Sequence, residues 1–333
     1  MNQQDALTTS LYSYLFEEAL ANESITICPG MHGSFSKETR RNNVYWYWVG
    51  RNNGKVTRIY IGADNKESEA LIVSLENRKD MAKLAIASMK RTAAAYRGAG
   101  GQLIEPSTFK ILAPLAYLFR KGVFVIGSHG FLSICNALGI SPLTGDDMKS
   151  ISLAIPDERK AVSDISPEFD ENFFKGVGKP LSSKTKVHVF TADRGSKKPV
   201  YFDDLGVAAE PLRFIDYLLG GEPFKGLVIG SYAIPVHLPN PARFAIHKLI
   251  ISQCADRSFN GGSEKDIAQA AVLLDYLIRE NAEQVVDALA TCLAVDGAVD
   301  NIRQSLVGLG AVDEKVAVFV GDQLTAKKAG FCI

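Results

Sequence analysis

The sequence predicts a protein of the α+β class, and three features of the chain support this prediction. A compact group of strand-like segments stands between two helical patterns near the N-terminus. Short apolar runs and helical patterns then follow one another through the middle of the chain, and the last quarter is mostly helical. Strands and helices grouped in this way are typical of the α+β class.

Composition and length limit the classes of protein that the chain can represent. It has 333 residues, of which 37 are basic and 37 acidic. The length suggests roughly two domains, and zero net charge argues against coating nucleic acid or an anionic membrane by bulk electrostatics. The five cysteines contain no CxxC pair, which argues against a disulfide framework and a zinc site. Neither a signal peptide nor an apolar stretch of membrane-spanning length is evident. We therefore expect a cytoplasmic protein with no membrane partner.

Residues 1–100 are expected to form an N-terminal helix, a small β-meander and a long helix. A short amphipathic pattern covers Asp5 to Leu20. Aromatic and β-branched residues from Val44 to Ile61 flank Asn53-Gly54, which is a strong signal for a hairpin turn. A charged, alanine-rich helical pattern then runs from Glu67 to Tyr96 and ends at the sequence "GAGG". This glycine-rich stretch is the best candidate for a linker to the next unit.

The predicted meander combines basic and aromatic residues. Six basic residues occur between Lys37 and Arg58, against a single acid, Glu38. Aromatic residues are interleaved with them, so the segment could neutralise a polynucleotide strand and stack on its bases. The alternative is a sheet with one buried aromatic face and one solvated charged face. The candidate nucleic-acid-binding residues, which we expect to lie on one face of the meander, are Lys37, Arg40, Arg41, Arg51, Lys55 and Arg58.

Residues 101–240 are expected to form a core of strands and helices, and residues 241–333 a helical C-terminal part. A helical pattern from Ser107 to Arg120 leads into an apolar strand, Val123 to Ile126. Further strands are expected at 148–155 and 186–192 and in the apolar run that ends before Asn240. Pro241 is well placed in the first turn of the helix that opens the last part.

The turn Gly127-Ser128 has the features of a phosphate-binding turn. The apolar strand ends there, and a helical pattern starts at once. Glycine allows close approach of the backbone, the helix N-terminus offers unpaired N–H groups and partial positive charge, and the serine hydroxyl adds a donor. Many strand-to-helix turns contain the same pair and bind nothing, so the pair by itself is a weak signal. His129 follows directly and could reach the phosphate, or could be a hydrogen-bonded structural residue.

Five motifs follow one another along the middle of the chain. They are "FVIGSHGFLSICNALGI", "KVHVFTADRG", "AEPLRFIDYLL", "PARFAIHKLIISQ" and "EKDIAQAAVLLDYLI". Their order resembles a bacterial family of minimal nucleotidyltransferases in the DNA polymerase beta-like superfamily, and the last two motifs carry the most specific part of the resemblance. The basic, aromatic segment near the N-terminus also looks like the module that precedes the core in such proteins. The resemblance covers most of residues 33–280.

This resemblance implies a short mixed sheet with helices packed on it, and a site for an NTP and divalent metal. In such a site two Asp stand two residues apart on the strand after the Gly-Ser helix, and a third carboxylate lies on a later strand. In this chain Ser150 and Ser152 occupy the first two positions and His188 occupies the third. Serine hydroxyls are poor Mg²⁺ ligands, and histidine suits Zn²⁺ or Mn²⁺ better. The sequence therefore predicts a site whose metal-binding acids are substituted.

Other residues could supply part of such a site. Asp146 and Asp147 lie just before the strand and are the best candidates for substitute metal ligands. Acids that follow the two strands are better explained as solvated loop residues. The resemblance implies that Lys248 and Lys265 face the triphosphate and bind nucleotide together with the Gly-Ser turn. The alternative is that Lys248 extends from an apolar helix to solvent and Lys265 lies at a helix start.

Two functions from different classes remain open. The first is a catalytically degenerate protein of the nucleotidyltransferase fold that binds nucleotide or RNA in a regulatory or partner role and needs no cofactor. The second is an active enzyme that moves NMP from an NTP to a hydroxyl of RNA, a protein or a small molecule, with Mg²⁺ or Mn²⁺ in an unusual metal site. The expected partners are an NTP and either an RNA such as tRNA or a protein. Loss of all three acids together favours the first function.

Overall fold

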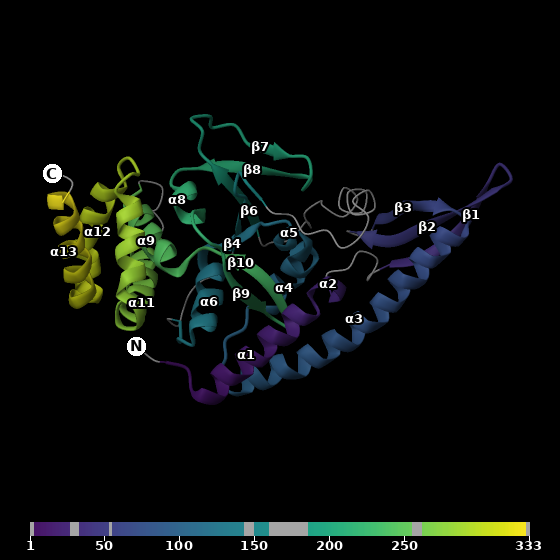
Figure 1. The fold of residues 1–333 in the computed structure, drawn as a ribbon, viewed down its shortest axis with the longest axis horizontal. Coiled ribbons are helices and arrows are strands. Elements are labelled where there is room, and N and C mark those ends of the chain that lie inside the picture. The colour runs from purple at the N-terminus through teal and green to yellow at the C-terminus, as the bar shows by residue number, and fades with distance from the viewer. Residues whose placement is uncertain are drawn as a thin grey trace.

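The computed structural model describes residues 3–26, 33–52, 55–142, 150–159, 186–254 and 262–330, and it has the predicted α+β architecture. Within these residues there is one three-stranded sheet and one seven-stranded sheet. Figure 1 shows the larger sheet in the middle of the molecule, the smaller sheet at one end and the C-terminal helices at the other. Among the helices described here, none combines the length and the apolar character needed to cross a membrane.

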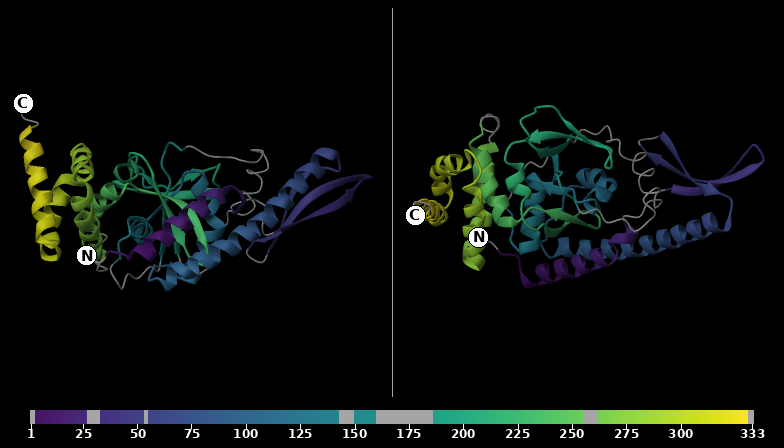
Figure 2. Two further views of the ribbon diagram at one scale, coloured as in Figure 1. Left: turned by 60° about the horizontal axis from the view of Figure 1, so that its bottom comes forward. Right: turned by 45° about the horizontal axis from the view of Figure 1, so that its top comes forward.

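The N-terminal part forms an arm that is built on one long helix. Its elements are α1 (Ala6–Ala21), α2 (Glu23–Thr26), β1 (Gly33–Arg40), β2 (Asn43–Asn52), β3 (Lys55–Ala63) and α3 (Lys66–Gly98). At 1.5 Å per residue, the 33 residues of α3 span about 50 Å. The three strands lie at one end of α3 and away from the central sheet, as both views in Figure 2 confirm. The predicted N-terminal helix, meander and long helix are thus all present.

The meander is antiparallel throughout. β1 pairs with β2, and β2 pairs with β3. Asn52 pairs with Lys55, so a two-residue connection joins β2 to β3, although Asn53-Gly54 themselves lie outside the described residues. Arg41 and Asn42 join β1 to β2, with φ of 46° and 70°. Positive φ at both central residues is typical of a type I′ hairpin turn, whose twist matches that of the flanking strands.

The two faces of the meander have different environments. Trp48 and Ile59 are buried on the face toward α3, where Phe35 and Ile61 pack against Leu75 of that helix. Because side chains alternate along a strand, the opposite face carries three tyrosines and two arginines at the surface. These residues are Tyr45, Tyr47, Tyr60, Arg40 and Arg58. Aromatic residues therefore occupy both faces, so the simple division into a buried aromatic face and a charged face was wrong.

The central sheet is mixed and has the strand order β7-β8-β6-β5-β4-β10-β9. The strands are β4 (Phe124–Ile126), β5 (Ser150–Ala154), β6 (Lys186–Ala192), β7 (Val200–Phe202), β8 (Val207–Leu212), β9 (Phe224–Ile229) and β10 (Ala233–Leu238). β4 is antiparallel to β5, and β5 is parallel to β6. The prediction that these three segments are neighbours in one sheet is confirmed.

Short helices pack around this sheet. They are α4 (Pro106–Leu112), η1 (Ala113–Leu115), α5 (Ala116–Arg120), α6 (Gly127–Leu138) and α8 (Ile215–Leu219). The segment from Ser107 to Arg120 was expected to be one helix, but it is interrupted near Pro114. Proline lacks a backbone N–H and clashes with the preceding turn, so it interrupts a regular helix.

The C-terminal part is helical, as predicted. It consists of α9 (Pro241–Ser252), α11 (Gly262–Cys292), α12 (Ala298–Val312) and α13 (Glu314–Gly330). Pro241 occupies the first turn of α9, and the Asn240 side chain accepts hydrogen bonds from the backbone N–H groups of Ala242 and Arg243. One hydrophobic cluster runs from Ile104 to Leu324 and joins these helices to the central sheet. The division of the chain into 1–100, 101–240 and 241–333 stays a prediction.

Candidate nucleotide-binding site

The Gly-Ser turn lies where β4 ends and α6 begins. Ile126 is extended, and Gly127, the first residue of α6, has a φ of +66°. A Cβ atom at Gly127 would lie 3.2 Å from the Cβ of Ser152. Glycine is required at this position for both reasons, since the conformation and the close approach each disfavour a side chain. The first N–H groups of α6 have no partner within the helix and are available to a phosphate.

Ser152 and His188 lie beside this turn on neighbouring strands. In the register of the sheet, Ser152 pairs with Ile126 on one side and with His188 on the other. Ser150 lies on the same face of β5 as Ser152, while Ile151 between them is fully buried on the opposite face. The structure therefore brings the two serine positions, the histidine position and the Gly-Ser turn together.

The acids that follow β5 and β6 lie at the end of these strands that is opposite the Gly-Ser turn. Because β5 runs antiparallel to β4, the C-terminal ends of β5 and β6 point away from the Gly-Ser turn. Asp157 lies beyond that far end and forms an ion pair with Arg194. Asp193 follows β6 at the same edge, and its carboxylate accepts a hydrogen bond from the backbone N–H of Gly195. These contacts agree with the interpretation of both acids as loop residues.

The residues placed around the turn do not fit a divalent metal ion. In the part of the chain that the structure describes, no three His, Cys, Asp or Glu side chains come close enough together to hold one. Neutral hydroxyls are weak ligands for Mg²⁺, and the anionic oxygens that it prefers are missing at Ser150 and Ser152. Asp146 and Asp147, the candidates for substitute ligands, lie outside the described residues.

His129, the second residue after Gly127, is buried beneath the turn. Its side chain is 1% exposed. Burial, followed by the positive charge of Lys265, lowers the pKa of His129 to about 4, while the backbone of Ser150 acts in the opposite direction. His129 is therefore neutral near pH 7. Lys265, whose charge acts on His129, lies in the first turn of α11.

Lys248 does not extend to solvent. Its Nζ lies 2.6 Å from Oδ1 of Asp266, and both side chains are almost fully buried between α9 and α11. Lys248 also lies over the ring of Phe244, 5.5 Å from its centroid. Asp266 neutralises Lys248 where it lies, so the alternative in which it extends to solvent from an apolar helix was wrong. The sequence did not identify Asp266 as the partner of Lys248, because the two residues are 18 positions apart on different helices.

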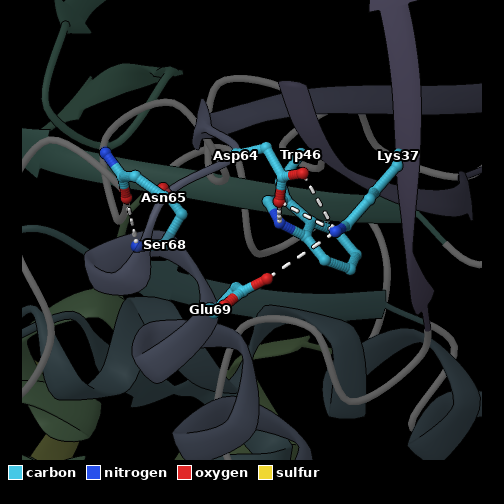
Figure 3. A network of polar contacts seen from close by, with 6 residues as sticks. All are labelled: Lys37, Trp46, Asp64, Asn65, Ser68 and Glu69. Carbon is cyan, nitrogen blue, oxygen red and sulfur yellow. Dashed lines mark hydrogen bonds and ion pairs between the residues drawn. The ribbon is translucent and has the colours of Figure 1, made fainter. Parts of the chain in front are cut away.

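The basic residues of the meander have unequal environments. Lys37 contacts Asp64 and Glu69 and lies over the ring of Trp46, at the junction of the meander with α3 (Figure 3). The hydrogen bond to Asp64 raises the pKa of Lys37. Arg40 and Arg58 both pair with Glu38 on the opposite face of the sheet. The prediction that the basic residues share one face was therefore wrong for Lys37, because it differs from Arg40 by an odd number of positions on β1.

Two other candidate residues of the meander, Arg51 and Lys55, have side chains outside the described part of the structure, and only their backbone pairing is described. Arg41 is exposed in the β1–β2 turn.

The mixed sheet places the Gly-Ser turn beside two paired strand positions, which is the arrangement that the resemblance to nucleotidyltransferases implies. Residues 111–294, more than half of the chain, match a family described as nucleotidyltransferase, and the chain belongs to this family. The match includes the turn, β5, β6, α9 and α11, and it begins after the meander. The resemblance of the meander to a module of such proteins stays a prediction. Neither the curated proteins nor the solved structures include a match to this chain.

Proposed function

We propose that this protein keeps the nucleotidyltransferase fold to bind a nucleotide or RNA in a regulatory or partner role, without transferring a nucleotidyl group. The observation that carries the proposal is the position of Ser152, which lies against Gly127 and pairs with His188. This is where the family resemblance expects the metal-binding acids. A serine beside the turn and a histidine opposite it supply no negative charge there.

Charge is the reason for expecting little turnover. An NTP carries several negative charges, and phosphoryl-group chemistry of this class requires that further charge be stabilised as the bonds change. Removing two or more anionic metal ligands should cost several kcal/mol of transition-state stabilisation, and each 1.4 kcal/mol lowers the rate about tenfold. Binding has weaker requirements, because backbone donors and positive charge can hold a phosphate without any carboxylate.

The expected phosphate contacts are the N–H groups at Gly127 and Ser128 and the ammonium group of Lys265. The role of Lys265 is supported by its effect on His129, the residue directly after the turn, because the charge of Lys265 lowers the pKa of His129. Lys248 was expected to join them, and its ion pair with Asp266 argues for a structural role instead. The nucleotide site that we propose therefore depends on the turn and on Lys265.

Calorimetric titration with ATP in the absence of metal tests this proposal. We expect saturable binding that Lys265→Ala weakens by about tenfold, the loss typical of one charge-assisted contact. Lys315→Ala is the matched control, because Lys315 is an exposed lysine of α13 outside the region matched to the family. A parent protein that does not bind ATP, or equal affinities for both variants, would overturn the proposed site.

An active enzyme remains a second candidate because of where Asp146 and Asp147 stand in the chain. They precede β5, and the N-terminal end of β5 lies on the Gly127 side of the sheet. The test incubates the parent protein with each labelled NTP, with Mg²⁺ or Mn²⁺, and with tRNA or protein acceptors. The degenerate protein that we propose shows little transfer in every combination. Robust transfer that disappears on Asp146→Ala and Asp147→Ala would establish the enzyme instead.

The meander supports RNA as a partner. Its exposed face places Tyr60 5.9 Å from Tyr45 and 5.7 Å from Tyr47, measured between ring centroids. Arg40 lies over the Tyr47 ring at 5.2 Å. Exposed rings beside guanidinium groups can stack on bases and contact the phosphates between them.

A further inference from the structure

A cavity lies at the other end of the central sheet from the Gly-Ser turn. Its volume is about 520 Å³, and its walls come from the C-terminal part of α3, the loop that leads into α4, and the β9–β10 turn. β10 is parallel to β4. The β9–β10 turn at the start of β10 therefore lies at the opposite end of the strands from Gly127, which follows the end of β4. Counting residues along the two strands puts roughly 30 Å between the turns. The cavity is therefore separate from the proposed nucleotide site.

Three cations line this cavity. Lys90 and Arg97 are seven residues apart on α3 and so lie on one side of that helix, and Lys110 is in the last turn of α4. Within the described part of the chain, none of the three forms a hydrogen bond or an ion pair with another residue. Glu105 is the one acid among the described lining residues, and its carboxylate accepts a hydrogen bond from the Ser107 hydroxyl. The lining thus has an excess of positive charge.

The remaining wall is apolar and firmly packed. Ile104 and Phe109 contribute to it, and both are almost fully buried. The rings of Phe109 and Tyr232 are perpendicular, with centroids 4.8 Å apart. A Cβ atom at Gly230 would come within 2.2 Å of the Phe109 ring, so only glycine lets the β9–β10 turn approach so closely. These contacts hold the apolar wall in place before any ligand arrives.

We propose that this cavity binds a small organic phosphate that carries a ring or another apolar group. Three unpaired cations from two helices carry more positive charge than a ligand with one carboxylate needs. They suit a phosphate ester, which has two negative charges and three oxygens. Arginine matches the geometry of phosphate through two parallel N–H donors, and lysine contributes a point charge. The volume lies within the range of small-molecule sites, and the apolar wall fits the organic part of the ligand.

Pyridoxal 5′-phosphate is a suitable probe, because it combines a ring, a phosphate and an aldehyde. Its aldehyde condenses with a lysine amine and releases water, and borohydride then reduces the imine to a stable amine. Peptide mass mapping identifies the labelled lysines. At low probe concentration we expect labelling at Lys90 or Lys110 ahead of the other lysines, and protection by excess phenyl phosphate. Labelling spread evenly over the surface, or labelling that phenyl phosphate leaves unchanged, would overturn the proposal.

A variant on the third cation provides the second readout. Arg97→Ala removes a phosphate contact without removing either lysine, so labelling should fall by about tenfold, and Arg97→Lys should keep part of it. Arg91→Ala is the matched control, because Arg91 is an exposed neighbour on the same helix that does not line the cavity. Circular dichroism verifies that each variant folds. Equal labelling of the parent and Arg97→Ala proteins contradicts the proposed site.

Discussion

Buried polar residues on α6, α9 and α11 have environments that the protein itself provides. Lys248 and Asp266 neutralise one another between two helices, and His129 is neutral because burial disfavours its charged form. Neither arrangement requires a ligand. We therefore expect substitutions at these residues to affect stability directly, whatever they do to binding.

The ion pair between Lys248 and Asp266 gives a prediction about stability. Asp266→Ala should lower the free energy of unfolding by about 3–5 kcal/mol, because it removes the carboxylate that forms an ion pair with a buried ammonium group. The double variant Lys248→Met, Asp266→Leu should recover most of this loss, since it removes both charges. Urea unfolding at pH 7 measures each value. Lys83→Ala, which breaks the exposed pair with Asp80, is the control and should cost less than about 1 kcal/mol. A cost at Asp266 as small as that of the control contradicts the prediction.

The lowered pKa of His129 predicts how the stability of the protein depends on pH. Its pKa is about 4 in the folded protein and near 6.5 in an unfolded chain, so between these values the unfolded state binds more protons. The contribution to stability is complete above pH 6.5 and is lost as the pH falls toward 4, to a total of about 3 kcal/mol. His129→Asn should remove this dependence.

The measurement compares unfolding of the parent and His129→Asn proteins at pH 7.5 and pH 4.5. Burial also lowers the pKa of His237, but both proteins share that effect, so the difference between them isolates His129. Identical slopes of stability against pH would show that His129 is more solvated than its environment indicates.

At the scale of elements, the meander depends on α3 and has its own small core. Leu75 of α3 is buried, and the partly buried Leu71, Phe35 and Ile61 pack against it. This cluster is separate from the two that involve the central sheet. The C-terminal half of α3 packs instead with α1 and β9, through Met89 and Tyr96 among others. One helix thus joins two parts of the molecule that bury different apolar surfaces.

We expect Leu75→Ala to open the meander while the central sheet stays folded. Removing a buried leucine typically costs about 2–5 kcal/mol, and here the loss falls on a small cluster. Hydrogen exchange followed by mass spectrometry should show faster exchange in β1–β3 and unchanged exchange in β4 and α6. Leu84→Ala on the same helix is the control, because Leu84 is 75% exposed. Faster exchange throughout the protein would mean that the meander and the central sheet unfold as one unit.

At the scale of the whole molecule, the proposed functions occupy separate places. Each of the three places is built from different elements. They are the Gly-Ser turn, the basic cavity at the opposite end of the central strands, and the tyrosine face of the meander. The meander is carried away from the central sheet by α3, as Figure 2 shows, so its exposed face is available to a long partner. A ligand at one of these places need not exclude a ligand at another.

Binding of RNA is the prediction that belongs to this scale. Arg40→Ala, Arg41→Ala and Arg58→Ala together should weaken tRNA retention on a filter by about tenfold or more, and should reduce the salt dependence of the parent protein. Lys83→Ala is the control for loss of one exposed positive charge from α3. If the parent protein retains no tRNA or single-stranded RNA at low salt, the exposed face of the meander does not bind polynucleotides.

The sequence by itself determined much of the local structure and which residue types occupy the candidate site. Apolar runs located β4, β5 and β6, and a helical pattern located α3, because burial on one face produces a periodicity that can be read along the chain. The residues at 150, 152 and 188 were also evident from the sequence, and their register in the sheet agrees with the expected grouping. The loss of a regular helix at Pro114 could have been predicted too, since proline acts locally.

Only the tertiary structure decided which charges meet. Asp266 neutralises Lys248, Lys37 joins the meander to α3, and Lys90, Arg97 and Lys110 converge on one cavity. A pattern along the chain reports whether a side chain is buried, but the partner of a charge depends on distance in space between segments far apart in sequence. Coulomb energy and desolvation follow that distance, so the roles of these charged residues appear only when the segments are packed together.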